Sequence, residues 1–271
     1  MDRNRISFNM HKISGEALGP FRREMASMLA ASPDPFLFVE YRIDVTKCLA
    51  LLQRLSAEKD VHLTLTPLLN KLLATAVFQN PIFNQVVLGN AIYQLEDIII
   101  SNGYLVPGTE PGLCFVLIKN AHQLSLVDIR EMLLQGREQK FAAFFAPRNR
   151  WQEALKRFIF RHNLLRFAGE KQVFKTALKA GLTSNIILQN HAYQTPASFR
   201  IIKPVITPMK VSLRIHAHRC EKQPLNPANP PAREILPLNV AVDHRVMLGI
   251  HAHRFGESLE KITATPEKYL L

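Results

Sequence analysis

The segment with the clearest capacity for chemistry lies near the end of the chain, at residues 242–249, which read Val-Asp-His-Arg-Val-Met-Leu-Gly. It follows an apolar, strand-like run from Ile235 to Val242 and closes on a glycine that suits a turn. Its histidine, His244, is the side-chain type that takes up and releases a proton near neutral pH. The segment therefore indicates a proton-transferring histidine at a strand end, or, as the alternative, a histidine that is packed there.

The elements that must position this histidine mix helices and strands without a strict βαβ alternation and without internal repeats. This mixture predicts an α/β sandwich with a mixed sheet rather than a doubly wound domain. We expect helices at 21–29, from an Asp44 N-cap onward, at 67–78 and from Ser125, strands at 36–43, 82–87, 91–95, 98–105 and 113–118, and an exposed loop at 221–233. The continuous apolar run 113–118 predicts a strand buried on both faces.

Several segments resemble, in order, the catalytic cores of the dihydrolipoyl acyltransferases of 2-oxo acid dehydrogenase complexes, whose fold chloramphenicol acetyltransferase shares. Residues 242–249 resemble their D-H-R-V-x-D-G motif. The other matching segments are 44–46 (D-V-T), 65–71 (L-T-P-F-L-x-K), 80–84 (Y-P-x-L-N), 112–126, 203–208 and the C-terminal 254–271. The resemblance spans about 36–136 and 177–271. It implies a chloramphenicol-acetyltransferase-like two-layer α/β sandwich, a mixed sheet with helices.

The resemblance also implies the domain organisation. Residues 1–271 would form a single acyltransferase-core domain, with a basic insertion at about 137–175. We expect no lipoyl domain, no subunit-binding domain and no lipoyl attachment.

The same resemblance assigns roles to two side chains. His244 would be the general base, its ring held by a bond to its own backbone carbonyl. The oxyanion donor in the family comes from T-[IV]-S-N of the neighbouring subunit, and Gly181-Leu182-Thr183-Ser184-Asn185 stands at the matching place. Ser184 is the first choice and Thr183 the reserve, while an ordinary turn into a strand is the alternative. The resemblance also implies a homotrimer or a multiple of three, with active sites between the subunits.

One position departs from the motif. Asp243, Arg245 and Gly249 match it, but Leu248 stands where the family has an acidic residue or asparagine. Leucine cannot make the polar contacts of that residue, and the arginine that would have paired with it is Arg22 or Arg23. If Leu248 fills an apolar pocket, Leu248→Asp should lower stability.

Two functions therefore stay open. The first is acyl transfer from a coenzyme A or carrier-protein thioester to an unidentified acceptor. The second is a non-catalytic scaffold derived from such an acyltransferase.

The charge of the chain is strongly positive, at +12, and residues 137–175 carry ten basic and three acidic residues, or +7 of it. A basic, fairly apolar helix is predicted at Trp151–Phe167. It could contact an acidic carrier protein, lie on a membrane surface, cover the substrate tunnel, or simply be packed or solvated. The sequence contains no nucleic-acid-binding motif, so nucleic acid is not an expected partner.

The remaining composition is that of an ordinary globular protein, with 47% apolar residues and no signal-like start. Three widely spaced cysteines, Cys48, Cys114 and Cys220, fit buried thiols in a reducing cytoplasm. The pairs His216/His218 and His251/His253 lack acidic or cysteine partners. We therefore expect surface histidines rather than a metal site.

Overall fold

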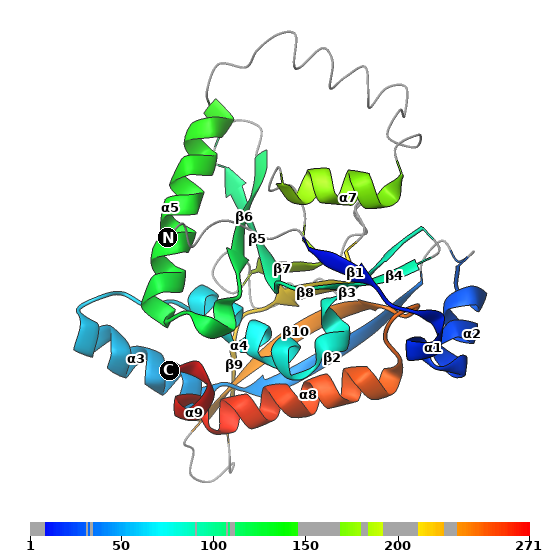
Figure 1. Ribbon diagram of the computed structural model, residues 1–271. Coiled ribbons are helices and arrows are strands. Elements are labelled where there is room, and N and C mark those ends of the chain that lie inside the picture. Colours follow the sequence, from blue (N-terminus) through cyan, green and yellow to red (C-terminus); the bar gives the residue numbers. More distant parts are fainter. Residues whose placement is uncertain are drawn as a thin grey trace.

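The computed structural model describes residues 9–30, 32, 35–89, 91–106, 108, 112–145, 169–179, 184–191, 211–224 and 232–271. Helices lie below and to one side of a broad sheet, with α7 on its other side (Figure 1). The elements are β1 Met10–Lys12, α1 Gly15–Leu18, α2 Pro20–Met28, β2 Phe36–Asp44, α3 Thr46–Lys59, α4 Leu65–Gln79, η1 Pro81–Asn84, β3 Gln85–Leu88, β4 Ala91–Leu95, β5 Ile99–Val106, β6 Gly112–Lys119, η2 Ala121–Gln123, α5 Leu126–Phe145, α7 Glu170–Lys179, β7 Ile186–Asn190, β8 Leu213–Ala217, β9 Glu221–Pro224, β10 Ala232–Asp243, α8 Gly249–Ala264 and α9 Pro266–Leu270.

The main sheet has the strand order β2-β10-β8-β7-β5-β6, with β9 paired to β10, and a second sheet has the order β1-β4-β3. The pairs β5–β7 and β7–β8 are parallel, and the other pairs of the main sheet are antiparallel. This confirms the mixed sheet of the predicted α/β sandwich.

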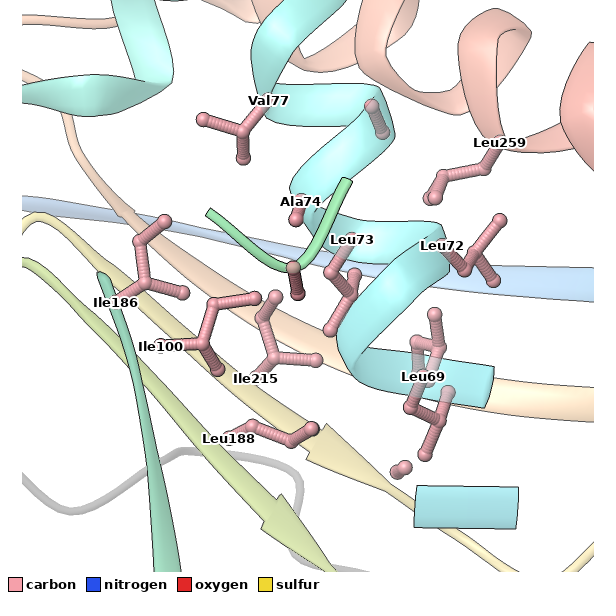
Figure 2. Packing of buried hydrophobic residues seen from close by; sticks show 14 of the residues in the cluster. Leu69, Leu72, Leu73, Ala74, Val77, Ile100, Ile186, Leu188, Ile215 and Leu259 are labelled. Atoms are coloured by element: carbon pink, nitrogen blue, oxygen red, sulfur yellow. The ribbon is translucent and has the colours of Figure 1, made fainter. Parts of the chain in front are cut away.

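Helix α4 forms the centre of the core. Its side chains are apolar on nearly every side, as expected of a helix enclosed by other elements. Leu73 and Ala74 lie on the side of α4 that faces Ile100, Ile186 and Ile215 of the sheet (Figure 2). On the other side of α4, Leu72 lies near Leu259 of α8 (Figure 2). The N-terminal residues of α4 are thereby fixed near the ends of β5 and β7.

Three expected elements differ from the structure. Residues 82–84 belong to the 3₁₀ turn η1, and the strand begins only at Gln85. The run 113–118 lies in β6, which is an edge strand with alternating burial, and Leu113 is 51% exposed. The prediction of burial on both faces was wrong because only one face of β6 packs against α5. Residues 221–224 and 232–235 pair as β9 and β10, so the expected loop is shorter.

The two ends of the basic insertion are helical, in α5 up to residue 145 and in α7 from residue 170. The predicted helix at Trp151–Phe167 lies outside the described residues. Within the described ranges, no helix has both the length and the apolar composition needed to cross a membrane.

Candidate functional site

A tight turn directly after β10 carries His244. The carboxylate of Asp243 accepts hydrogen bonds from the backbone N–H of Arg245 at 3.0 Å and from its guanidinium at 2.9 and 2.6 Å. The backbone carbonyl of Asp243 accepts from Val246 and Met247, both at 3.0 Å. Asp243 is buried, and a buried, bidentate arginine–carboxylate pair is a strong and directional contact. The motif residues Asp243 and Arg245 therefore hold the backbone on both sides of His244.

The imidazole of His244 is oriented by one hydrogen bond. Its Nδ1 lies 2.8 Å from the backbone carbonyl oxygen of Met247. The expected bond to its own carbonyl is therefore wrong, and the partner lies three residues further along the turn. A carbonyl oxygen only accepts, so Nδ1 carries the proton and Nε2 of the neutral ring keeps its lone pair. This is the tautomer that a general base requires.

Leu248 occupies the N-cap of α8, with φ −92° and ψ 165°. Its backbone N–H donates to Nδ1 of His251 at 2.9 Å, and its carbonyl accepts from the N–H of His251 at 2.9 Å. An aspartate at an N-cap would accept from the free N–H groups of the first turn, and the leucine side chain has no atom that can do so. His251 therefore supplies part of the capping that residue 248 does not.

Arg22 of α2 lies beside this cap. Its charge contributes, after burial, to lowering the pKa of His251. Its Nη2 donates to Gln85 at 3.0 Å, while its Nε is buried without a partner among the described residues. Leu248 itself is only partly buried. The expectation that the turn is packed around the apolar side chain of Leu248 therefore stays a prediction. Of the two arginines proposed from the sequence, Arg22 is the one whose charge acts on this cap, and its buried Nε has no partner among the described residues.

Ser184 lies just before β7 and is fully buried. Its hydroxyl donates to the backbone carbonyl of Ile186. The side-chain N–H of neighbouring Asn185 donates to Asn84 at 2.9 Å. A group with no exposed surface cannot reach a substrate without rearrangement, so the geometry favours a structural role for Ser184 and Asn185. The reserve hydroxyl, Thr183, lies outside the described residues.

Strand register places His244 and a pocket lined by Asn102, Asn190 and His191 at opposite ends of the sheet. Asn190 at the end of β7 pairs with Ala217, which pairs with Leu238 of β10. His244 lies six residues beyond Leu238, or roughly 20 Å at about 3.3 Å per residue. In a single chain, His244 therefore does not face the ends of β5 and β7.

A pocket of about 220 Å³, termed here the amide pocket, opens at the ends of β5 and β7. It is lined by Thr66, Asn102, Gly103, Tyr104, Leu105, Leu113, Leu188, Gln189, Asn190 and His191. The amides of Asn70 and Asn102 bond reciprocally at 2.8 and 3.0 Å, and the amide of Asn190 donates to the Thr66 hydroxyl at 3.0 Å. Polar side chains are thus held in fixed orientations around an otherwise apolar pocket.

Three histidines stack beside this pocket. The rings of His191 and His216 are 5.1 Å apart, with Nε2 of His191 3.1 Å from Nδ1 of His216, and His218 stacks on His191 at 6.2 Å. Burial, followed by the charges of His191 and His218, lowers the pKa of His216 to about 3. His216 and His218 are buried, so the expectation of surface histidines was wrong for this pair. Within the described ranges, no group of three or more histidine, cysteine or acidic residues has the geometry of a metal site.

Comparison with known families gives one match. Residues 11–142 match the family of 2-oxoacid dehydrogenases acyltransferase (catalytic domain). The match ends before β7 and so does not include His244. No curated protein sequence matches the chain significantly.

Solved structures show the same fold. The dihydrolipoamide acetyltransferase of Azotobacter vinelandii is 19% identical, with a TM-score of 0.65, over 93% of this chain and 88% of that chain. The cubic core of a pyruvate dehydrogenase multienzyme complex gives the same values. A chloramphenicol acetyltransferase is 12% identical, with a TM-score of 0.55, over 94% of this chain and 100% of that chain. The sandwich is therefore the fold of these acyltransferases.

Proposed function

We propose a function for this chain from the match of residues 11–142 to the family of 2-oxoacid dehydrogenases acyltransferase (catalytic domain). The proposed activity is transfer of an acyl group from a coenzyme A or carrier-protein thioester to an acceptor. In this reaction a base removes the proton from the attacking thiol, hydroxyl or amine, which then attacks the thioester carbonyl. The resulting oxyanion needs a hydrogen-bond donor. Collapse of the tetrahedral intermediate releases the thiolate, which takes up the proton.

The observation that carries this proposal is the orientation of His244. Its Nδ1 is engaged by the Met247 carbonyl at 2.8 Å, which leaves the lone pair of Nε2 for the proton of the attacking group. In the Azotobacter vinelandii enzyme, a serine, a histidine and an asparagine four positions after the histidine were investigated for their role in catalysis. His244 and Leu248 have this spacing, which supports the role of His244.

A site formed between two chains fits the separation of His244 from the amide pocket. Because the two lie roughly 20 Å apart in one chain, His244 of one subunit would act at the pocket of the next. We propose that the assembly is a homotrimer or a multiple of three, which is supported by the likeness of the fold to a subunit of a cubic core. The oxyanion donor would then belong to the pocket side, and Thr183 stays a candidate.

Other parts of the proposal concern the surroundings of the reaction. Coenzyme A would be a co-substrate, and the proposed chemistry uses neither a metal nor a lipoyl group attached to this chain. An acidic carrier protein or a membrane surface remains a proposed partner of the basic insertion. Burial raises the pKa of Cys48 to about 12 and that of Cys220 to about 11, which keeps both as thiols and fits a reducing cytoplasm.

The second candidate function is a non-catalytic scaffold. It is favoured by Leu248, which provides no side-chain acceptor at the N-cap next to the catalytic turn. In this case the chain would keep the fold and the subunit contacts without turnover.

A thioester screen separates the two functions. The purified chain is incubated with acetyl-, propionyl- and succinyl-coenzyme A and with thiol, amine and alcohol acceptors, while free thiol release is followed. The enzyme hypothesis predicts acceptor-dependent release. If the rate of thiol release does not exceed that in buffer for any pair of donor and acceptor, and light scattering shows the protein to be trimeric, the result would support the scaffold function and contradict the enzyme hypothesis.

A further inference from the structure

A single peptide group connects two imidazole rings in the turn after β10. The carbonyl of Met247 and the N–H of Leu248 belong to the same planar peptide unit. The carbonyl oxygen lies 2.8 Å from Nδ1 of His244, and the N–H donates to Nδ1 of His251 at 2.9 Å. The ring of His251 therefore holds one end of the peptide group whose other end orients His244. This chain of contacts is termed here the histidine relay.

The two contacts of the histidine relay require different protonation at Nδ1 of the two rings. A backbone N–H only donates, so Nδ1 of His251 accepts and carries no proton. A carbonyl only accepts, so Nδ1 of His244 carries one. A hydrogen bond at the N–H polarises a peptide group and strengthens the bond at its carbonyl. The neutral ring of His251 thus favours the tautomer of His244 that a base needs.

His251 is fixed in this position by the start of α8. It is the third residue of the helix, and its own N–H donates to the Leu248 carbonyl at 2.9 Å. A side chain that reaches back from this position to the N-cap N–H is the arrangement of a capping box, in which glutamate or glutamine is usual. Histidine differs from glutamine because its accepting atom takes up a proton near neutral pH. The contact is therefore one that pH can remove.

Protonation of His251 reverses the character of its Nδ1. In the imidazolium ring this atom is a donor, so it would face the N–H of Leu248 donor to donor. Either the peptide group rotates and withdraws the Met247 carbonyl from His244, or the His251 ring turns away and the peptide group loses its support. In both cases His244 is held less firmly with its lone pair on Nε2.

The surroundings of His251 keep it neutral at pH 7. Burial, and then the charges of Arg22 of α2 and Arg254 of α8, lower the pKa of His251 below its ordinary value of 6.5. On the turn itself, the carboxylate of Asp243 is paired with the guanidinium of Arg245 at 2.6 Å, which compensates its negative charge. The ring of His251 is therefore available as an acceptor at neutral pH and changes its role only in acid.

We propose that His251 is a positioning residue for the reaction, which holds the peptide group between Met247 and Leu248 so that His244 acts as the base, and whose protonation lowers the activity. This inference rests on the proposed acyltransferase function. It assigns the support of the catalytic turn to a titratable side chain of α8, whereas the motif that this turn resembles has an acidic residue or asparagine at position 248.

The tautomer of His244 tests the histidine relay without any substrate. Nitrogen NMR of the full chain, labelled in its histidines, distinguishes a ring proton on Nδ1 from one on Nε2, and His244→Ala identifies the signals. At pH 7, His251→Ala should shift the tautomer ratio of His244 toward Nε2–H by roughly 3–10-fold, the net effect of one hydrogen bond. His251→Gln, which keeps an acceptor, should retain the natural ratio. An unchanged ratio in His251→Ala would overturn the proposal.

Kinetics separate positioning from a merely structural role. With an N-acetylcysteamine thioester as donor, His251→Ala should lower kcat by roughly 3–10-fold and leave KM within about a factor of two, because the base changes and the substrate contacts do not. Ala252→Gly, which weakens the same turn of α8 and keeps His251, is the control. It should lower the thermal midpoint and leave kcat unchanged. Equal losses of kcat in the two variants would show that only the stability of α8 matters and would refute the positioning role.

The pH dependence of kcat/KM gives a further readout, with circular dichroism confirming the fold at each pH. In the natural chain a proton on His244 or on His251 lowers the rate, so the logarithm of kcat/KM should fall in acid with a slope steeper than one. In His251→Gln only the proton on the base counts, and the slope should be one. Equal slopes in the two chains would contradict the proposed effect of protonation.

Failure of the histidine relay and failure of the function give different results. An unchanged His244 tautomer in His251→Ala, together with acyl transfer by the natural chain, would refute the positioning role and keep the enzyme. A changed tautomer, without transfer from any donor, would support the contact through the peptide group and refute the acyltransferase function on which the inference rests.

Discussion

Replacing Leu248 by aspartate should stabilise the N-terminus of α8 and with it the turn that holds His244. The side chain at this N-cap has no acceptor, and the first helical N–H groups are orphan donors unless a side chain or water satisfies them. An aspartate N-cap is worth about 1 kcal/mol relative to alanine. Its negative charge at the helix N-terminus adds about 0.3–1 kcal/mol. The buried Nε of Arg22, which has no partner among the described residues, gives the carboxylate a further donor nearby.

The lost leucine contacts oppose this gain, because burying a whole leucine is worth about 1.5–3 kcal/mol and this one is only partly buried. Leu248→Ala loses the same leucine contacts as Leu248→Asp, so the difference in stability between these two variants contains only the contribution of the aspartate cap. We expect the free energy of unfolding of the aspartate variant to exceed that of the alanine variant by about 1–2 kcal/mol, or roughly 2–4 °C in thermal midpoint for a chain of this size. Leu248→Asn, which caps without charge, should lie between them.

Thermal unfolding at pH 7 and at pH 3 measures this difference. At pH 7 the aspartate is ionised, and its advantage should be present. A carboxylate at a helix N-terminus contributes stability above its unfolded pKa of about 3.9, and this contribution is lost as the pH falls. Midpoints for Leu248→Asp at or below those of Leu248→Ala at pH 7 would refute the assignment of residue 248 as an unsatisfied cap.

Three further outcomes follow from other contacts. The folded protein holds the pKa of His216 at about 3, against 6.5 for an ordinary histidine, so the contribution of this group to stability is complete above about pH 6.5 and is lost as the pH falls toward 3. His216→Gln should therefore reduce the loss of unfolding free energy between pH 7 and pH 4.5, measured by urea titration. An unchanged pH dependence would contradict this. In Gly136→Ala the new Cβ would lie 2.5 Å from Cγ1 of Val116. The cost of overpacking, about 1–3 kcal/mol, should exceed the helix-propensity gain of about 1 kcal/mol and lower the thermal midpoint. A raised thermal midpoint would show that β6 moves to accommodate the methyl group. Asp243→Asn leaves the Arg245 guanidinium without its buried carboxylate and should cost about 3 kcal/mol in urea unfolding, and a cost below about 0.5 kcal/mol would deny the pair a role in the turn.

The mixed α/β sandwich could be predicted from the elements of the sequence, whereas its chloramphenicol-acetyltransferase-like form was implied by the resemblance of several segments to a known family. The apolar faces of 36–44, 65–79 and 232–243 have strand or helix periodicity, and these elements meet in the core. The errors occurred where burial depends on the neighbours of an element. The apolar run 113–118 has no feature that distinguishes an edge strand from a central one. The pair His216/His218 has the spacing of a strand whether or not that strand is covered.

The site was predictable in part. The motif around His244 is contiguous, so its turn could be expected, and the structure adds the orienting carbonyl of Met247. The choice of Ser184 did not follow from such a local contact. It depended on an order of residues in the chain, and the buried hydroxyl of Ser184 shows that order alone does not give access. The capping contact of His251 depends on how its side chain is turned, and the amide pocket brings together residues of α4, β5, β6 and β7 that are distant in the sequence, so no sequence motif marks either of them.

The most direct test of the central claim is the rate of acyl transfer for two single-histidine variants measured side by side. His244→Ala removes the proposed base, and His253→Ala removes an exposed histidine of α8 whose Nε2 lies 3.4 Å from the carboxylate of Glu257. With an N-acetylcysteamine thioester as donor, we expect His244→Ala to lower kcat/KM by at least ~100-fold and His253→Ala to leave it within about a factor of two. Equal rates for the two variants, both folded, would contradict the assignment of His244 as the general base.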